Sequence, residues 1–432
     1  MVHPQARRLL ITAVAAISAL AMGACSGTPS NSGTTTTNGP AATDTTTAAP
    51  TGQTITVWHY FSDPNQVALM DKYAQLFEAA YPGNTVSNVY VPYDQMNSKL
   101  VAAAGSNTGP DVAVFNGADA ATLVLGGALA PIDDQLNAWA DKAQLPSSVI
   151  HVINGKTYAV QGYVNLLGLW YNQDILTQLG LQPPTTMDEL ESDMAAAKAA
   201  GFMGITLSGL PNSQGEWQAY PWLTEKGFSY DNLDQSALSA GLALGRDWVQ
   251  KGYLSAESAT WDQTVPFNTF TAGQTLFAEN GNWQMGTAAS DAKFKYGVTS
   301  LPIGSSAGVY LGGEGEAVGA FSKNPDLAWD YITSAYLSPE GQLAAQSMVG
   351  SLPSRLDTAK DPSVTGNALL APFAATIASN GAVYPAESIP PEGVADVQTA
   401  MGQAWSAALS GQQSPDAAAA TAITAVKAAM GK

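Results

Sequence analysis

One segment of the sequence fits the pattern of a nucleophilic hydrolase. Gly304-Ser305-Ser306-Ala307-Gly308 matches Gly-x-Ser-x-Gly, in which the serine lies on a sharp turn between a strand and a helix. That arrangement requires an acid and then a histidine later in the chain, and no histidine follows Ser306. The sequence also lacks the spaced histidines and paired cysteines that bind zinc. These patterns therefore predict no catalytic serine, no metal and no cofactor.

Indole rings and polar side chains gather in another part of the sequence. The tryptophans are Trp217, Trp222, Trp261 and Trp283, and Gln214, Glu216, Gln218, Asp262 and Gln263 lie among them. An aromatic plane can cover the C–H face of a sugar ring, while amides and carboxylates hydrogen-bond its hydroxyls. We therefore expect these four tryptophans to contribute to a binding site for a polyol. The alternative is that each is a packing residue, because tryptophan is usually buried.

Strands and helices alternate at the start of the body. The β-branched run at 55–58 predicts a strand, and Asp63 with Pro64 is typical of a helix start. A strand at 85–91, a helix at 94–104 and a strand at 112–115 are expected to follow. This order predicts an open, mainly parallel α/β sheet with helices on both faces.

Polar residues follow the first and third of these strands. Tyr60, Ser62 and Asp63 come after the first, and Asn116 and Asp119 after the third. Ligands of open α/β sheets bind beyond the carboxyl ends of the strands, so all five are candidate ligand contacts. The acids and the asparagine are equally suited to cap helices, and one side chain can do both.

A second α/β unit follows the first. A strand is expected at 166–171, a helix that begins with a Thr186/Glu189 capping box and ends near Gly201, and a strand at 204–208. Two α/β halves in one chain indicate two lobes with a cleft between them.

These segments together resemble the family-1 extracellular solute-binding proteins, which include the maltose- and other sugar-binding proteins of bacterial importers. The resemblance extends from Ile55 to about Ala425 and rests on I-T-V-W (55–58), G-P-D-V-A-V-F (109–115), G-G-A-L-A-P-I-D (126–133), G-K-T-Y-A-V (155–160), L-W-Y-N-Q-D-I-L (169–176), P-P-T-T-M-D-E-L (183–190), F-T-A-G-Q-T-L-F (270–277), G-N-W (281–283) and S-L-P-S-R (351–355). Met187 stands where the family usually has tryptophan.

The resemblance implies a two-lobed, periplasmic-binding-protein-like α/β fold. Three hinge crossings are expected near Val164, Leu301 and Leu352. Lobe one would then comprise about 53–164 and 302–352, and lobe two about 165–301 and 353–432. The family's mode of action implies a monomer whose lobes close around a carbohydrate and then dock on the permease subunits of an ABC transporter.

The resemblance also indicates particular ligand contacts. Trp283 occupies a motif position that commonly faces the cleft, and Tyr163 and Asn165 stand where the lobes meet. Gly312-Gly313-Glu314 resembles the family's Gly-Gly segment that reaches the cleft, which makes Gly313 and Glu314 candidate contacts. A hairpin turn is the alternative. Arg355 is expected to anchor a hinge carboxylate rather than a ligand.

The N-terminus is typical of an exported lipoprotein. Arg7 and Arg8 precede an apolar run that stops at Cys25, and Met22-Gly23-Ala24-Cys25 resembles a lipobox. We therefore expect a signal peptide over residues 1–24, a lipidated Cys25, and a disordered tether over 25–53 rich in Ser and Thr. The protein would lie on the outer face of the cytoplasmic membrane, attached by its lipid alone. An ordinary signal peptide with an accidental cysteine is the alternative.

Charge and composition limit the other function classes. The formal net charge of −18 argues against nucleic acid as a partner. A secreted glycoside hydrolase is the enzymatic alternative, because its cleft would also combine aromatic rings with carboxylates such as Asp262, Glu314 and Glu316. A binding protein for a non-sugar solute, such as an amine, is the other alternative. The sequence favours a binding protein over an enzyme.

Overall fold

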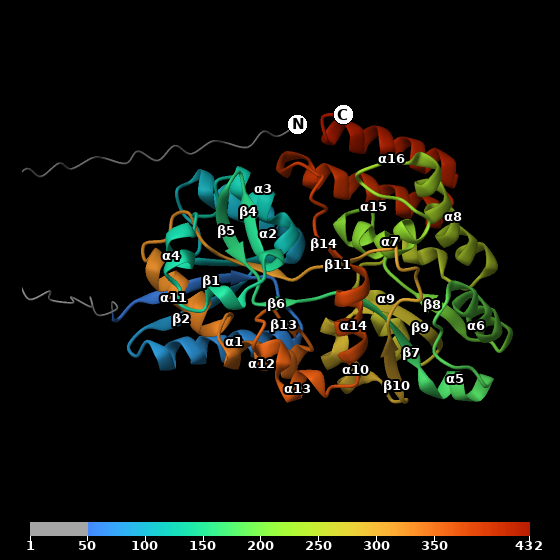
Figure 1. Cartoon of the computed structure of the whole chain (residues 1–432), viewed down its shortest axis with the longest axis horizontal. Helices are drawn as coiled ribbons and strands as arrows, with labels where there is room; N and C mark the ends of the chain where they lie inside the picture. The colour runs from blue at the N-terminus through green and yellow to red at the C-terminus, as the bar shows by residue number, and fades with distance from the viewer. Residues whose placement is uncertain (1–50) are drawn as a thin grey trace, which may run out of the picture. The chain divides into compact units, whose positions relative to one another are not determined.

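The computed structural model describes residues 51–432, in which two sheets are each flanked by helices (Figure 1). The predicted signal peptide, Cys25 and nearly all of the tether lie outside the described residues. Within the described part of the chain, no helix is both long and apolar enough to cross a membrane.

The first sheet has six strands. Their spatial order is β2 (Thr85–Tyr90), β1 (Thr54–His59), β3 (Val112–Asn116), β12 (Glu314–Val318), β5 (Lys156–Val160) and β4 (Ile150–Ile153). Strand β1 pairs in parallel with both β2 and β3, whereas β12 runs antiparallel to β3 and β5. The carboxyl ends of β1, β2 and β3 therefore meet at one edge.

Helices cover both faces of this sheet. They are α1 (Pro64–Ala80), α2 (Tyr93–Gly105), α3 (Ala120–Leu125), α4 (Asp133–Ala138), α11 (Pro325–Ala335) and α12 (Pro339–Val349). Helix α1 begins as predicted, with the Asp63 carboxylate accepting the Asn65 N–H at 2.9 Å and Pro64 in the first turn. Its buried Tyr73 and Phe77 pack in one hydrophobic cluster with Val57 of β1.

The second sheet has four strands. Their order is β10 (Tyr296–Thr299), β7 (Leu167–Asn172), β9 (Thr275–Gly281) and β8 (Met203–Thr206). Its flanking helices are α5 (Gln173–Leu179), α6 (Met187–Ala199), α9 (Thr264–Thr271), α10 (Met285–Asp291) and α14 (Ala371–Asn380). The capping box predicted for Thr186 and Glu189 is present at the start of α6.

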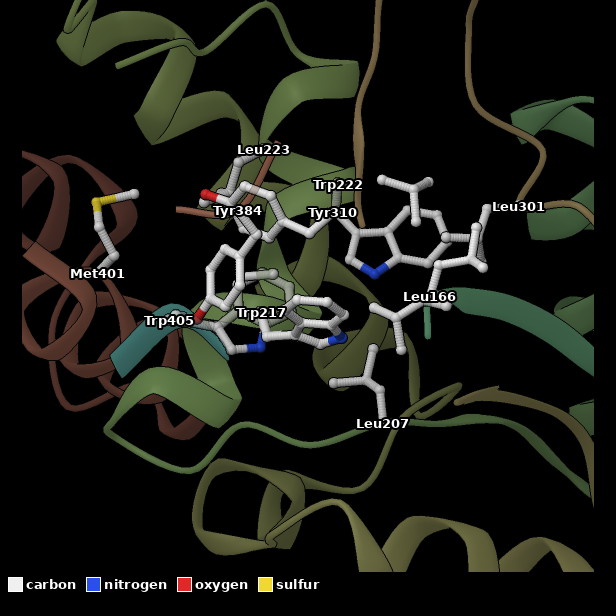
Figure 2. Close-up of a cluster of buried hydrophobic side chains, with 14 of the residues drawn as sticks. Leu166, Leu207, Trp217, Trp222, Leu223, Leu301, Tyr310, Tyr384, Met401 and Trp405 are labelled. Atoms are coloured by element: carbon white, nitrogen blue, oxygen red, sulfur yellow. The ribbon is translucent and has the colours of Figure 1, made fainter. Parts of the chain in front are cut away.

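Four further helices form a layer beside the second sheet. These are α7 (Ser213–Glu225), α8 (Gln235–Lys251), α15 (Val394–Ser410) and α16 (Pro415–Ala429), with the short α13 (Pro362–Thr365) elsewhere. Figure 2 shows part of their core, in which Trp222 and Trp405 lie among leucines and Met401. Single turns of 3-10 helix occur at Gly117–Asp119, Lys142–Gln144, Ser147–Val149, Ala256–Thr260, Asn282–Gln284, Thr358–Lys360 and Pro391–Gly393.

The predicted α/β class is confirmed, but the expectation of mainly parallel sheets is wrong. In the first sheet only the two pairings of β1 are parallel, and in the second only the pairing of β8 with β9. Consecutive strands that run parallel in a sheet are joined by a crossover connection, usually a helix. Strand β12 arrives from the other lobe instead, so no crossover helix forces it to run parallel to its neighbours. Both sheets are therefore mixed.

Short backbone pairings mark the places where the chain passes between the sheets. Strand β6 (Tyr163–Val164) pairs antiparallel with β13 (Leu352–Pro353). Next to them, Asn165 and Gly312 exchange two backbone hydrogen bonds of 2.9 and 2.8 Å. These pairings hold together the stretches of chain that pass between the sheets. We call these stretches the crossing segments.

Strand β11 (Val309–Leu311) does not lie in lobe one, where it was predicted. It pairs with β14 (Gly381–Val383) and contacts α7, so it packs with the second sheet. The second passage therefore falls at about Gly312 and not near Leu301. The other lobe boundaries stay predictions.

Arg355 anchors the third crossing segment, as expected. Its buried guanidinium donates to Asp141 at 2.9 Å and to Asp357 at 2.7 Å. The same guanidinium holds the pKa of the Asp357 carboxyl well below its usual value. A further donated bond, to the Leu337 carbonyl at 3.1 Å, ties the segment to the residues that follow α11.

The Asn282 side chain joins two of the crossing segments at one buried point. Its Oδ1 accepts the Leu166 N–H at 2.9 Å, and its Nδ2 donates to Asn165 Oδ1 and to the Gly350 carbonyl, each at 2.9 Å. Asn282 is fully buried, so none of these partners can exchange its bond for water.

We expect Asn282→Ala to lower the free energy of unfolding by about 3 kcal/mol, because it leaves buried donors and acceptors unpaired. Denaturant unfolding measures this loss. Asn280→Ala is the matched control, since Asn280 is equally buried but bonds only to Gln263 and Gly281, both within the second lobe. Solution scattering should show a wider spread of lobe separations for Asn282→Ala alone. The same scattering from both variants would contradict a role for Asn282 at the crossing.

Candidate ligand-binding site

A cavity of about 540 Å³ lies where the ends of the two sheets face each other. Its lining comprises Tyr60, Ser62, Asp63, Gln66, Tyr90, Tyr93, Asn116, Gly313 and Glu314 on the side of the first sheet, Ser213, Gln214, Trp217, Asp262, Gln263, Thr264, Asn268, Trp283, Gln284, Thr287, Asp291 and Tyr384 on the side of the second, and the crossing residues Asn165 and Gly312. The volume is within the usual range for a small-molecule site.

Tyrosine and amide groups at strand ends build the first wall. The Tyr60 hydroxyl donates to Glu314 Oε1 at 2.8 Å, and the Tyr60 ring meets Tyr93 edge to face at 5.0 Å. Asn116 Nδ2 donates to the Tyr93 hydroxyl at 3.2 Å, while its Oδ1 accepts the Ala118 N–H at 3.0 Å. The carboxyl ends of β1 and β3 thus present a connected set of hydrogen-bonding groups.

Glu314 is the carboxylate at the back of this wall. Burial raises the pKa of its carboxyl, and hydrogen bonds from Tyr60 and Tyr163 oppose that shift. Asn165 Nδ2 lies 3.5 Å from Oε2. The Tyr60 and Tyr163 hydroxyls therefore already donate hydrogen bonds to Glu314.

Trp217 forms part of the opposite wall. Its ring meets Tyr384 edge to face at 4.7 Å and lies 5.6 Å from Tyr310. The indole also lies directly over Gly312, where a Cβ atom would be only 2.3 Å from the ring. The ring is held on both sides and has 7% of its surface exposed.

Trp283 lies at the end of β9 and folds back over its own chain. A Cβ atom on Gly281 would be 1.8 Å from the indole, so only glycine permits this ring position. Trp283 is partly exposed, unlike the fully buried Trp222. It therefore offers an aromatic face to the cavity.

Two acids line the cavity while they cap helices. Asp63 caps α1, and Asp262 accepts the N–H groups of Thr264 and Val265 at 2.9 and 3.1 Å at the start of α9. Each helix N-terminus carries partial positive charge, which stabilises these carboxylates. With Asp291 and Glu314 the lining holds four acids, and it contains no lysine, arginine or histidine.

Residues 72–372 match the family described as bacterial extracellular solute-binding protein. This match covers more than half of the chain. The chain belongs to this family.

Known members and structures agree with the match. The lactose-binding protein of Rhizobium radiobacter is 25% identical over 67% of this chain and 72% of its own length. The maltooligosaccharide ABC transporter solute-binding lipoprotein of Streptococcus pneumoniae is 22% identical over 46% of this chain and 49% of its own. The GacH receptor of Streptomyces glaucescens, solved unliganded and with acarbose, is 26% identical, with a TM-score of 0.78 over 89% of this chain and all of the receptor.

This solute-binding protein thus has the predicted two-lobed fold, and the predicted membership of the family is confirmed. The family consists of binding proteins, in agreement with the expectation that the chain is not an enzyme. The hydrolase-like Ser306 lies in an exposed turn between β10 and β11, away from the cavity lining. Among the described residues, no group of three or more His, Cys, Asp or Glu is placed to hold a metal.

The structure brings most of the predicted contacts of this solute-binding protein to one cavity. Those that line it are Tyr60, Ser62, Asp63, Asn116, Asn165, Trp217, Trp283, Gly313 and Glu314. Their roles in binding stay predictions. Asp119, Tyr163, Trp222 and Trp261 do not line it.

Packing explains why the three aromatic residues of this group do not line the cavity. Trp222 is fully buried, donates its indole N–H to Glu279 Oε2 at 2.9 Å and packs on Trp248, so it is a core residue and the prediction is wrong. Tyr163 is buried behind Glu314, and its carbonyl lies under Gly313. Trp261 follows a 3-10 turn and uses its carbonyl to accept the Ser208 hydroxyl at 2.8 Å.

Asp119 lies one layer behind the cavity. Burial raises the pKa of its carboxyl to about 6, and a hydrogen bond with Asn97 opposes the shift. The pKa of the Tyr93 hydroxyl is raised first by burial and then by the charge of Asp119, so Asp119 acts on a lining residue without lining the cavity.

Sequence reasoning missed several lining residues. Tyr90 and Tyr93 flank the end of β2, where the strand-end rule applied to β1 and β3 would have found them. Ser213 begins α7, a position that its capping residue Asn212 signals. Tyr384 has no such signal, because it lies in an irregular segment after β14.

We expect Gly312→Ala to lower the free energy of unfolding by about 1–3 kcal/mol, because the added methyl group overlaps the Trp217 indole. Denaturant unfolding measures the change. Gly304→Ala is the control, since a Cβ there meets only the Glu225 carboxylate at 3.3 Å. Equal stability of the two variants would show that Trp217 is free to move away.

Proposed function

We propose that this solute-binding protein captures a sugar or short oligosaccharide outside the cytoplasmic membrane and delivers it to the permease of an ABC importer. The observation that carries the proposal is the cavity lining, which combines Trp217, Trp283 and several tyrosines with amides and hydroxyls. Aromatic faces suit the C–H surface of a sugar, and the polar groups suit its hydroxyls. The predicted contacts that line the cavity would supply the binding groups.

The charges of the lining support a neutral ligand over an anionic one. Phosphate esters and dicarboxylates are bound mainly by arginine and lysine, neither of which lines the cavity. Carboxylates such as Glu314 and Asp262 accept hydrogen bonds from sugar hydroxyls. The excess of acids also favours one second candidate, an amine-bearing solute.

Closure of the lobes would complete the site. The lining comes from both sheets, so a ligand bound between them would make contacts with both. Only the crossing segments connect the lobes in sequence, and β6 and β13 contribute just two residues each to their pairing. Hinge rotation at these segments would then present the closed form to the permease. We expect the protein to act as a monomer with no nucleic acid partner.

A panel of solutes tests the function by thermal shift and calorimetry. We expect lactose, maltotriose or acarbose to stabilise the protein, by about 2.7 kcal/mol at 100 times its dissociation constant. Scattering should then show a smaller radius of gyration. Glucosamine and spermidine test the amine candidate, and phosphate and succinate serve as negative controls. Binding of phosphate or succinate, with no saccharide bound, would overturn the proposal.

Trp283→Ala separates recognition from packing. If the indole stacks on a sugar ring, its loss should cost about 2–3 kcal/mol of binding, or roughly 30- to 150-fold in affinity. The matched control is Trp222→Ala, which should cost about 3–5 kcal/mol of folding stability because Trp222 is a core residue. Calorimetry and denaturant unfolding are measured on both variants. A large stability loss with unchanged affinity in Trp283→Ala would assign Trp283 to the core.

The membrane anchor is proposed from the sequence around Cys25, with support from the lipoprotein relative. We expect Cys25→Ser to release the protein into the medium, because the acyl chain would be its only attachment. The released variant should bind the same saccharides and unfold at the same denaturant concentration as the wild type. Retention of the variant on washed cells would contradict the lipid anchor.

A further inference from the structure

A buried carboxylate without a cationic partner lies behind the second wall of the cavity. Glu216 Oε1 accepts the hydroxyls of Tyr310 at 2.7 Å and Tyr230 at 2.8 Å, and Oε2 accepts that of Tyr384 at 3.4 Å. Glu216 has 1% of its surface exposed and does not line the cavity. Its environment therefore consists of phenol groups rather than water or a salt bridge.

Two of the three tyrosines hold Trp217. The rings of Tyr310 and Tyr384 both contact the Trp217 indole, and Tyr384 itself lines the cavity. Figure 2 shows Trp217, Tyr310 and Tyr384 close together in the core. The third, Tyr230, packs on Phe228 and Tyr220 and has no ring contact with Trp217.

The three hydroxyls bring distant segments to one carboxylate. Tyr310 belongs to β11, Tyr384 follows β14, and Glu216 precedes Trp217 on α7. The Gln398 amide of α15 donates to the Tyr384 hydroxyl at 2.8 Å and so directs its hydrogen toward Glu216. The position of the wall thus depends on how strongly one side chain accepts hydrogen bonds.

We propose that Glu216 is a positioning residue that fixes Trp217 and Tyr384 in the cavity wall through the tyrosine hydroxyls, and that its protonation changes this wall. The proposal deepens the proposed function, because a saccharide would bind against this wall.

Protonation of Glu216 changes what its oxygens can accept. Ionised, both oxygens accept, and charge-assisted bonds of this kind are the stronger ones. Protonated, one oxygen becomes a donor, and Oε2 is the preferred position because its bond to Tyr384 is the longest. The Tyr384 hydroxyl, which lies beside the cavity, then loses its acceptor.

The electrostatic balance at Glu216 supports this response. Burial raises the pKa of its carboxyl to about 7, while the Tyr310, Tyr230 and Tyr384 hydroxyls lower it. Tyr220 also lies near Glu216, since the pKa of its hydroxyl is raised first by burial and then by the charges of Glu216 and Asp231. No lysine, arginine or histidine of the described chain opposes its protonation.

Fluorine NMR of the full chain labelled with 5-fluorotryptophan tests the proposal without ligand. Loss of one resonance in Trp217→Phe assigns the signal of residue 217. We expect this signal to shift with a midpoint near pH 7 in the wild type, and to stay constant with pH in Glu216→Gln. A signal that does not titrate in the wild type, or titrates equally in Glu216→Gln, would overturn the proposal.

Two conservative variants serve if Glu216→Gln does not fold. Tyr310→Phe and Tyr230→Phe each remove one buried hydroxyl from the same Glu216 oxygen, and neither ring lines the cavity. We expect only Tyr310→Phe to move the Trp217 signal. Equal signals from the two variants would contradict the positioning role.

Calorimetry with acarbose extends the test to binding. We expect Tyr310→Phe to weaken acarbose about fivefold to tenfold and Tyr230→Phe by less than twofold. Equal losses in the two variants would indicate a general effect on stability and count against positioning. Failure of the wild type to bind acarbose would count against the proposed ligand class, whereas the fluorine signal alone decides the role of Glu216.

Discussion

The hydrogen bonds of the Asn282 carboxamide are the constraint on which the rest of the site depends. They fix the end of β9 to Leu166 and Asn165 on one crossing segment and to Gly350 on another. Trp283 follows Asn282 directly, so the same bonds set where this indole meets the cavity. Asn165 in turn pairs with Gly312, over which the Trp217 indole lies. One buried amide therefore connects both aromatic walls with the passage of the chain between the lobes.

Glycines at the crossing segments leave the space that the two indole rings occupy. Gly281 and Gly312 leave room for Trp283 and Trp217, and Gly313 has a φ of +152° and approaches the Tyr163 carbonyl. Any side chain at these positions would push an indole or a backbone segment out of place. The shape of the cavity is thus set largely by residues that have no functional group to offer a ligand.

Sequence patterns predicted the local elements of this fold well, but not the direction of the strands that arrive from the other lobe. Asp63 and Thr186 mark helix starts by local chemistry, and both cap helices in the structure. The antiparallel direction of β12 depends on how the chain returns from the other lobe to pair with β3, and no local sequence pattern predicts this.

The same distinction applies to the site. Residues at strand ends, such as Tyr60 and Asn116, follow from a rule of α/β sheets, and both line the cavity. Trp217 and Trp222 lie on one helix and look equivalent in sequence, yet one faces the cavity and the other is core. Tyr384 reaches the cavity only because β14 pairs with β11, a contact between residues some seventy positions apart. Tertiary packing decides such cases.

Buried acids without cations are the unusual feature of the region around the cavity. Burial raises the pKa values of Glu216, Glu279, Glu314 and Glu316, and no basic side chain of the described chain bonds to any of them. Charged, each would be costly in a medium of low polarity. Tyrosine hydroxyls donate to Glu314, which lines the cavity, and to Glu216, which lies behind the lining, whereas Glu279 and Glu316 each keep one unpartnered oxygen deeper in the core.

The two pairs differ in what acts on the carboxyl pKa. At Glu279 and Glu316 burial raises the pKa and one oxygen has no partner, which favours the neutral form. At Glu216 and Glu314 burial also raises the pKa, but hydrogen bonds from tyrosine hydroxyls oppose the shift. The tyrosine rings of the cavity walls are thus held in place by hydrogen bonds from their hydroxyls to these two carboxyls. Because the lining holds four acids and no basic side chain, the same electrostatics that make these acids costly to bury support the proposed preference for a neutral solute over an anion.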